Sequence, residues 1–148
     1  MKNLTLERAT IKDVDTFLEL ERSIGNVSTY SAMTNREEAL EEMKTNVVYF
    51  IRVGDRIIGD VMYEMKSPGH AYISGLVVRP DFQGRGFGTA AMVKVLEELR
   101  DVSTIDLVTH PDNVRSIKLY ESLGFIIGKR IENYFGDGEP RIVMTFKR

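Results

Sequence analysis

The chain has 148 residues, of which 43% are hydrophobic and 28% are charged, and its formal net charge is −2. These values are typical of one folded domain and exclude a largely disordered chain, while the charge excludes the strongly basic surface of nucleic-acid-binding proteins. The absence of cysteine excludes disulfides, thiolate metal sites and a cysteine nucleophile.

The start of the chain has no apolar stretch followed by a small-residue cleavage site, and no apolar run approaches the roughly 20 residues that cross a bilayer. The two histidines, His70 and His110, are too few and too separate to indicate a zinc site. We therefore expect a single domain over residues 1–148, in the cytoplasm, with no metal and no nucleic acid or membrane partner.

The N-terminal half predicts one strand, two helices and then three strands. Leu4 to Arg8 alternates apolar and polar residues, which is typical of a strand. Thr10, followed by Asp13, marks a helix start, and Asn35 opens a second helix that runs to about Thr45. Turns containing glycine separate three further strands, which should form an antiparallel meander: 47–53, 56–65 and 70–78.

The C-terminal half alternates helix and strand. Gly88 to Arg100 carries apolar residues at the spacing of an amphipathic helix. A strand at 104–109, a helix at 113–123 that ends at Gly124, and strands at about 125–134 and 141–147 follow. The strands before and after the first of these helices should be parallel, because a helical crossover joins them. The predicted fold class is α/β, in the order β-α-α-β-β-β-α-β-α-β-β.

Three alternate glycines between Gln83 and Thr89 lie where a strand gives way to a helix. Glycine permits a sharp turn and close approach of a ligand, and the unpaired N–H groups of a first helical turn attract anions. With the positive charge of Arg85, a pyrophosphate is the natural occupant. A tight loop without a ligand is one alternative. A dinucleotide motif, which residues 86–91 match formally, is another, but it belongs on the first strand–helix turn of a Rossmann unit and here follows a meander.

Two motifs resemble those of the GNAT superfamily of N-acetyltransferases. Gln83-x-x-Gly86-x-Gly88 is similar to the family's acetyl-CoA signature, Q/R-x-x-G-x-G/A. Residues 111–125 are similar to its N-x-x-A/S-x-x-L-Y-E-x-x-G-F segment. The two motifs occur in the family's order, and the order of predicted elements matches over nearly the whole chain.

Within the superfamily, the N-terminal protein acetyltransferases of the ribosomal-protein alanine type are most similar. They share an aromatic run near the tail, here Asn133-Tyr134-Phe135. The resemblance implies a GNAT-like mixed, mostly antiparallel sheet flanked by helices. It also implies transfer of an acetyl group from acetyl-CoA, as cosubstrate, to a primary amine.

The resemblance further implies where the coenzyme binds. A strand segment, Leu76, Val77 and Val78, pairs with the pantetheine arm. The glycine-rich turn holds the pyrophosphate; its residues are Gln83, Gly84, Arg85, Gly86, Phe87, Gly88 and Thr89. Two residues of the second motif, Asn113 and Ser116, contact the arm. Gly75 independently indicates a bulge or splay, which would free the Leu76 N–H to polarise the thioester carbonyl. The alternatives are core side chains for 76–78 and a helix N-cap for Asn113.

Tyr120 matches the family's general acid. A thiol has a pKa near 8.5 and a phenol one near 10, so the tyrosine protonates the leaving thiolate only from within hydrogen-bond reach. A buried core aromatic is the alternative role.

The general base is less clear. In the alanine-type enzymes a glutamate lies on the strand before the second motif, but Val108 occupies that position here. Glu64 is our substitute, because it shares a strand face with Asp60 and Met62, although a solvated carboxylate is the alternative. Ser74, His110 and water also stay open as the base.

The sequence does not identify the acceptor amine. In family folds the acceptor enters between the 23–35 loop and the segment from Glu132 to Glu139, whose carboxylates and aromatics suit an amine. A protein or peptide N-terminal amine is our hypothesis, and a small polyamine or aminoglycoside is the alternative. A non-catalytic coenzyme A-binding regulatory module is a rival, against which Tyr120 counts. A homodimer is left open.

Overall fold

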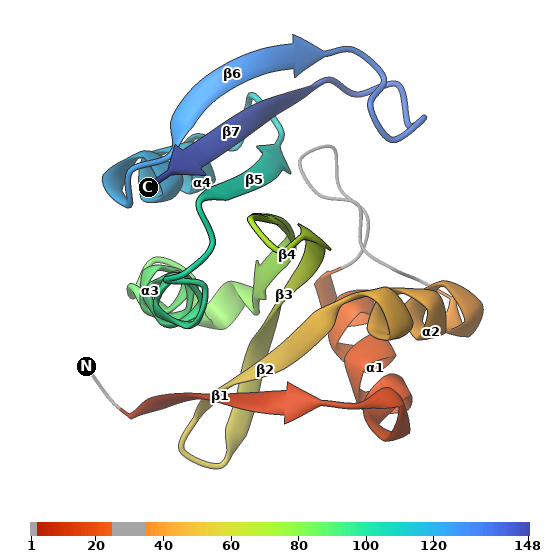
Figure 1. The fold of residues 1–148 in the computed structure, drawn as a ribbon. Helices are drawn as coiled ribbons and strands as arrows, with labels where there is room; N and C mark the ends of the chain where they lie inside the picture. The colour runs from red at the N-terminus through yellow and green to blue at the C-terminus, as the bar shows by residue number, and fades with distance from the viewer. Residues whose placement is uncertain (1–2, 25–34) are drawn as a thin grey trace.

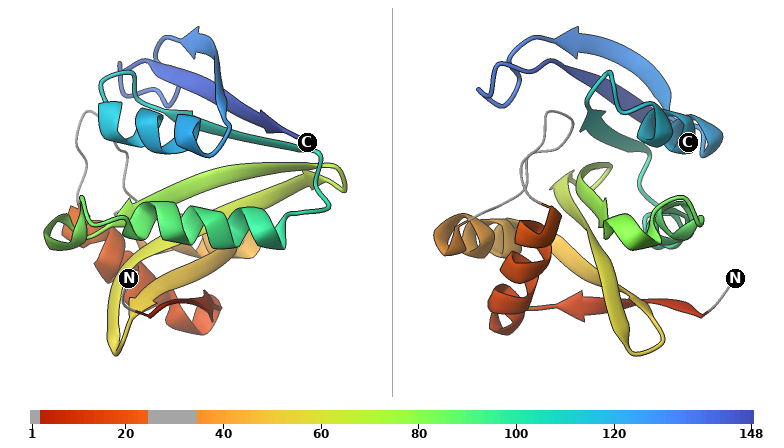
Figure 2. Two further views of the ribbon diagram at one scale, coloured as in Figure 1. Left: turned by 90° about the vertical axis from the view of Figure 1, so that its left-hand side faces the viewer. Right: turned by 180° about the vertical axis from the view of Figure 1, so that it is seen from behind.

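The computed structural model describes residues 3–24 and 35–148, and it places a seven-stranded sheet between two pairs of helices (Figures 1 and 2). The strands are β1 (Leu4–Ala9), β2 (Val47–Val53), β3 (Arg56–Ser67), β4 (His70–Val78), β5 (Thr104–Thr109), β6 (Ile126–Ile131) and β7 (Arg141–Lys147). The helices are α1 (Val14–Ile24), α2 (Arg36–Thr45), α3 (Phe87–Glu98) and α4 (Val114–Ser122), with 3-10 turns at Ile11–Asp13 and Pro80–Phe82. No helix within these ranges is long and apolar enough to cross a lipid bilayer.

The sheet has the order β1-β2-β3-β4-β5-β7-β6, and its predicted mixed direction is confirmed. Five of the six described pairs of neighbouring strands are antiparallel, and only β4 and β5 are parallel. The helical crossover through α3 accounts for that parallel pair, as the sequence predicts.

Polar side chains cap the 3-10 turn that leads into α1 and the first turn of α2, at the helix starts that the sequence predicts. The Thr10 hydroxyl accepts a hydrogen bond from the Lys12 N–H (3.3 Å), and the Asp13 carboxylate accepts one from the Thr10 N–H (2.9 Å). The Asn35 side chain accepts the Glu38 N–H at 2.8 Å. These caps satisfy N–H groups that have no partner inside the helix.

Alternating side chains of β2 enter two separate apolar cores, one on each face of the sheet. Val48 and Phe50 pack with the apolar faces of α1 and α2, whereas Ile51 packs on the side of α3. Neighbouring residues of a strand point to opposite faces. A central strand that is covered by helices on both sides is therefore apolar almost throughout.

The predicted strand at 125–134 is shorter in the structure and ends at Ile131. Asn133 has a positive φ of 51°, and its side chain accepts the Gly138 N–H at 2.6 Å, which closes a turn. Asparagine tolerates this backbone conformation better than most residues. The aromatic residues Tyr134 and Phe135 therefore lie in the connection between β6 and β7, on no strand.

Gly59 gives a test of how closely β3 and β4 approach each other. A Cβ on this residue would lie 2.0 Å from the Val77 carbonyl oxygen, so the strands would have to separate. We expect Gly59→Ala to lower the free energy of unfolding by about 3 kcal/mol, measured by urea denaturation. Gly69→Ala is the control, because its Cβ would meet only the Ser103 hydroxyl at 3.4 Å. Equal stability of the two variants would contradict this close approach.

Candidate active site

The parallel strands β4 and β5 pair over only four residues each and then diverge. Pairing runs from His70 opposite Thr104 to Ile73 opposite Leu107. Beyond this point β5 continues along β7 alone, and β4 continues along β3 alone. At the start of the divergence β4 has a bulge, because Gly75 lies opposite Met62 and Ile73 lies opposite Tyr63. The bulge that the sequence predicts at Gly75 is therefore confirmed.

Backbone groups of β4 face the opening. The Arg79 N–H donates to the Ile58 carbonyl of β3 at 2.7 Å, and alternate residues of a strand direct their N–H groups to opposite sides. Leu76 and Val78 therefore present their N–H and C=O groups away from β3, toward the gap. One of these groups, the Val78 carbonyl, accepts a hydrogen bond from Nε2 of the Gln83 side chain at 2.9 Å.

The glycine-rich turn leads from β4 into α3. Gly84 and Gly86 have φ values of +75° and +85°, which residues with a Cβ adopt only with strain. Gly86 is the N-cap of α3 and offers no side-chain cap to the N–H groups of the first helical turn. These N–H groups are consequently open to an external anion.

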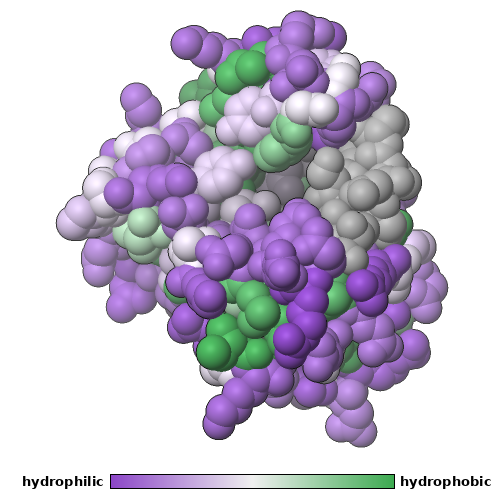
Figure 3. All heavy atoms as spheres, turned by 90° about the vertical axis from the view of Figure 1, so that its right-hand side faces the viewer, coloured by the Kyte–Doolittle hydropathy of each residue, from purple (hydrophilic) through white to green (hydrophobic). Residues whose placement is uncertain are grey.

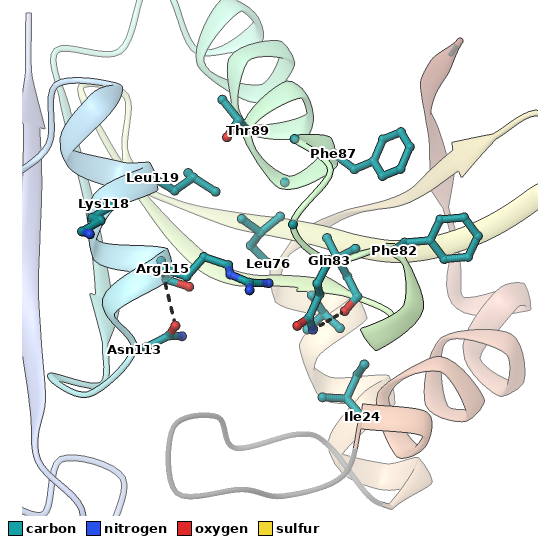
Figure 4. Close-up of a pocket in the computed structure, with 16 residues that line it drawn as sticks. Ile24, Leu76, Phe82, Gln83, Phe87, Thr89, Asn113, Arg115, Lys118 and Leu119 are labelled. Atoms are coloured by element: carbon teal, nitrogen blue, oxygen red, sulfur yellow. Dashed lines mark hydrogen bonds between the residues drawn. The ribbon is translucent and has the colours of Figure 1, made fainter. Parts of the chain in front are cut away.

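A cavity of about 550 Å³ extends from this turn to α4 (Figure 4). Its lining includes 11 of the 12 residues that the sequence predicts to bind the coenzyme: Leu76, Val77, Val78, Gln83, Gly84, Gly86, Phe87, Gly88, Thr89, Asn113 and Ser116. Arg85 is the exception, and its guanidinium lies 5.4 Å from the centre of the Phe82 ring. Its contact with a phosphate stays a prediction.

Arg115 and Lys118 also line this cavity, and neither was predicted from the sequence. Figure 4 shows the Arg115 side chain reaching from α4 toward the glycine-rich turn, and its Nη1 would lie 3.7 Å from a Cβ on Gly84. The two cations are three residues apart and so share a helix face. This spacing of two basic residues within the second motif could have indicated from the sequence that both face the cavity.

A smaller cavity of about 90 Å³ occupies the gap itself, deeper in the sheet. It shares Leu76, Asn113 and Ser116 with the larger cavity, so the two are adjacent. The rest of its lining comes from both diverging strands, α4 and the β6–β7 hairpin: Ile73, Ser74, Gly75, Leu107, Val108, Thr109, Tyr120, Phe135 and Arg141. We call it the inner cavity. Its described lining contains no Asp, Glu or His.

Tyr120 reaches the inner cavity from the buried face of α4. Its side chain packs edge-on against Phe125, with ring centres 5.9 Å apart, and its hydroxyl makes no hydrogen bond to any residue that the structure describes. Burial raises the pKa of Tyr120 to about 12. The phenol is therefore protonated throughout the physiological pH range.

Asn113 has the N-cap role that the sequence offers as one alternative, while its contact with the coenzyme stays a prediction. Its Oδ1 accepts the Ser116 N–H at 3.3 Å, so it caps α4, and the same side chain borders both cavities. Capping occupies the amide oxygen only. The amide nitrogen stays available as a donor to a ligand.

Glu64 is not among the described residues that line the inner cavity. It forms an ion pair with Lys66 (3.2 Å) and lies opposite Tyr72 on the neighbouring strand. Its role as a base stays a prediction. Val108 lines the inner cavity, at the position where the resemblance implies a glutamate in the alanine-type enzymes.

The carboxylates of the β6–β7 hairpin are bound to basic side chains of the same chain. The three contacts are Glu132–Arg130 (2.7 Å), Asp137–Arg141 (3.1 Å) and Glu139–His110 (2.7 Å). Arg130 lowers the pKa of Glu132. The hairpin therefore offers the acceptor less free negative charge than the sequence indicates.

Arg141 is the one charged side chain that the structure describes in the lining of the inner cavity. It is almost fully buried at 2% exposure, and it donates to the Pro140 carbonyl at 3.0 Å as well as to Asp137. Its guanidinium also lies 5.1 Å from the centre of the Phe135 ring. Neither composition nor spacing marks this residue, which the fold alone brings beside Tyr120.

The expected acceptor entrance includes residues 25–34, which lie outside the described residues. The face that carries α2 and the end of the β6–β7 hairpin is largely hydrophilic (Figure 3). Burial, followed by the charges of Glu38 and Glu64, raises the pKa of Glu42 on this side.

Comparisons with known proteins agree with this geometry. A sequence profile of the acetyltransferase (GNAT) family matches residues 14–125. An uncharacterized N-acetyltransferase of Methanocaldococcus jannaschii is 26% identical over 149 residues, which cover 98% of this chain and 92% of that protein. The ribosomal protein bS18-alanine N-acetyltransferase of Escherichia coli is 38% identical over 80 residues, about half of each chain (51% and 54%).

Among solved structures, a GNAT family acetyltransferase from Elizabethkingia anophelis with acetyl-CoA bound has the same fold. Its TM-score is 0.79 at 17% identity, and the match covers 100% of both chains. The matched profile spans most of the sequence, including both motifs, the diverging strands and the glycine-rich turn. The chain belongs to the GNAT family of acetyltransferases.

Proposed function

We propose that this enzyme transfers the acetyl group of acetyl-CoA to the N-terminal α-amine of a protein or peptide. The observation that carries the proposal is the lining of the inner cavity. Its described part contains no carboxylate and no imidazole, and its single charged group is the guanidinium of Arg141. A site of this kind favours an amine that arrives neutral.

The acceptor's own pKa decides how much neutral amine is available. An α-amine has a pKa of about 7.7–8.0 and a lysine amine one of about 10.4, so at pH 7.5 about a third of the former but only about 0.1% of the latter is neutral. Arg141 adds no group that would stabilise an ammonium ion, and its positive charge is partly offset by the ion pair with Asp137. The Escherichia coli relative, named for acetylation of a ribosomal protein's alanine, supports the same acceptor class.

The coenzyme would occupy the larger cavity, with its pyrophosphate at the N–H groups of residues 84–89 and near Arg115. Its pantetheine arm would extend β4 in place of β5, with the thioester carbonyl at the Leu76 N–H. That N–H then stabilises the oxyanion of the tetrahedral intermediate. The relative from Elizabethkingia anophelis, which binds acetyl-CoA, supports this assignment.

Tyr120 completes the reaction by giving its proton to the departing thiolate. The phenol is a weaker acid than in water, but burial also raises the pKa of a thiol in the same cavity, so the two groups stay closer in pKa than the phenol value alone implies. The amine loses its proton to water and Tyr120 regains a proton from water, so the products are the amide and the thiol of coenzyme A.

The first prediction concerns coenzyme binding. Gly86→Val should weaken acetyl-CoA binding by at least about 100-fold, because a side chain at this turn blocks the approach of the phosphates to two or more N–H groups. Isothermal calorimetry measures the effect. Gly54→Val is the matched control, since Gly54 also has a positive φ (+60°) but lines neither cavity. Similar affinities for both variants would contradict the assigned phosphate site.

The second prediction concerns the general acid. Tyr120→Phe should leave the Kd for acetyl-CoA unchanged and lower kcat by about 10²–10⁴-fold, since the variant loses only the proton donor. A thiol-reactive dye follows coenzyme A release, and the protein has no cysteine to interfere. In the parent enzyme the pKa of Tyr120 is about 12, so its phenol stays protonated up to about pH 10. We therefore expect no loss of kcat from ionisation of Tyr120 between pH 8 and about pH 10. An unchanged kcat in the variant, with chemistry rate-limiting, would assign Tyr120 to the core alone.

The third prediction concerns the acceptor. On a peptide that carries a free N-terminus and an internal lysine, we expect acetylation of the N-terminus first, with a kcat/KM advantage that is largest near pH 7 and shrinks toward pH 10. Mass spectrometry of the product locates the acetyl group. Lysine modification alone, or turnover only of polyamines or aminosugars, would overturn the peptide N-terminal acceptor.

A further inference from the structure

Ser74 is the extra residue of the β4 bulge. The residues on either side of it, Ile73 and Gly75, lie opposite consecutive residues of β3, which leaves Ser74 without a cross-strand partner. Ser74 also lines the inner cavity, beside Gly75 and Leu76. A bulge redirects a side chain relative to the rest of its strand.

The Ser74 hydroxyl donates its hydrogen bond to Oδ1 of Asn46, which follows the last turn of α2. Asn46 is almost fully buried, at 7% exposure. Its Nδ2 lies 3.0 Å from the backbone carbonyl of Glu42 and 3.0 Å from the Glu42 carboxylate. Both of these oxygens accept hydrogen bonds, so they fix which end of the amide is nitrogen.

The orientation of the amide in turn fixes the direction of the Ser74 hydrogen. The amide oxygen that faces Ser74 is an acceptor only, and therefore the serine must donate to it. A hydroxyl has one hydrogen and two lone pairs. With the hydrogen committed to Asn46, the remaining capacity of Ser74 Oγ is to accept a hydrogen bond.

We propose that Ser74 positions the acceptor amine by accepting one of its N–H groups, and that Asn46 and Glu42 hold the serine in this accepting orientation. The inference rests on the proposed function and deepens it. A neutral primary amine has two N–H groups and one lone pair. An N–H directed at Ser74 leaves the lone pair free to attack the thioester carbon, whose carbonyl lies at the Leu76 N–H.

This role differs from that of a general base. A hydroxyl that already donates to an amide and accepts from the amine takes no proton from it, and the amine loses its proton to water after attack. The described lining of the inner cavity offers no stronger base, in agreement with a substrate that arrives neutral. Ser74 is therefore a positioning residue, and its effect should be on the acceptor and not on the coenzyme.

The test compares Ser74→Ala with Ser74→Thr, which keeps the hydroxyl. For the amine that the parent enzyme acetylates best, Ser74→Ala should lower kcat/KM by about tenfold, the value of one hydrogen bond, with the acetyl-CoA Kd unchanged. Ser74→Thr should restore kcat/KM to within about twofold. Ser103→Ala is the matched control, because that hydroxyl also donates to an acceptor on a neighbouring segment, the Gly69 carbonyl, and lines neither cavity.

A double-mutant cycle tests whether Asn46 acts through Ser74. Asn46→Leu alone should lower kcat/KM for the amine, and in a Ser74→Ala background it should cause no further loss. Thermal unfolding of each variant separates any loss of stability from this kinetic effect. Parent-like kcat/KM in Ser74→Ala, or independent effects of the two substitutions on kcat/KM, would overturn the proposal.

A parallel assay with two classes of amine separates failure of the peptide N-terminal acceptor from failure of the Ser74 role. Peptides with a free N-terminus and a polyamine are assayed in parallel with the parent enzyme. If only the polyamine is acetylated, the peptide N-terminal acceptor is wrong, while the comparison of Ser74→Ala with Ser74→Thr on the polyamine still decides the role of Ser74. A parent enzyme that binds acetyl-CoA and acetylates neither class overturns both.

Discussion

The early end of the pairing between β4 and β5 is the constraint on which the site depends. Parallel strands in a continuous sheet satisfy each other's backbone groups, so neither edge is open to a ligand. Here the pairing stops at Ile73 and Leu107, and the β4 backbone beyond that point faces a cavity. Tyr120 and Asn113 border the space that this divergence creates, and the glycine-rich turn lines the larger cavity next to it.

Two local features keep the strands apart. The bulge at Ser74 changes the course of β4, and Gly75 beside it accommodates Met62 of β3, whose Cε would lie 2.7 Å from a Cβ. On the other side, β5 stays aligned with β7 over all six of its residues, so it cannot follow β4. Residues of α3 and α4 pack in one apolar core with both halves of the sheet. The opening therefore belongs to the fold and does not require a ligand to form.

Much of the fold and of the lining of the larger cavity could be predicted from the sequence, because both depend on local signals. The caps Thr10 and Asn35, the alternation of apolar residues and the glycine-rich turn each act within a few residues. Arg141 and the Ser74–Asn46 contact could not be predicted, since they depend on how distant elements meet. The end of β6 at Ile131 was also missed, because the aromatic run extends the apolar pattern into the turn that Asn133 forms with its positive φ.

The edge strand β6 has a consequence for how this protein behaves at high concentration. All six of its residues are exposed, including Ile126 at 73%, and no strand that the structure describes pairs with its outer side. Such an edge invites pairing with a strand from another molecule. The register break between Ile127 and Arg130, together with the charges of Lys129 and Arg130, interrupts the regular row of backbone groups that such pairing needs. These features protect the apolar edge from aggregation without covering it.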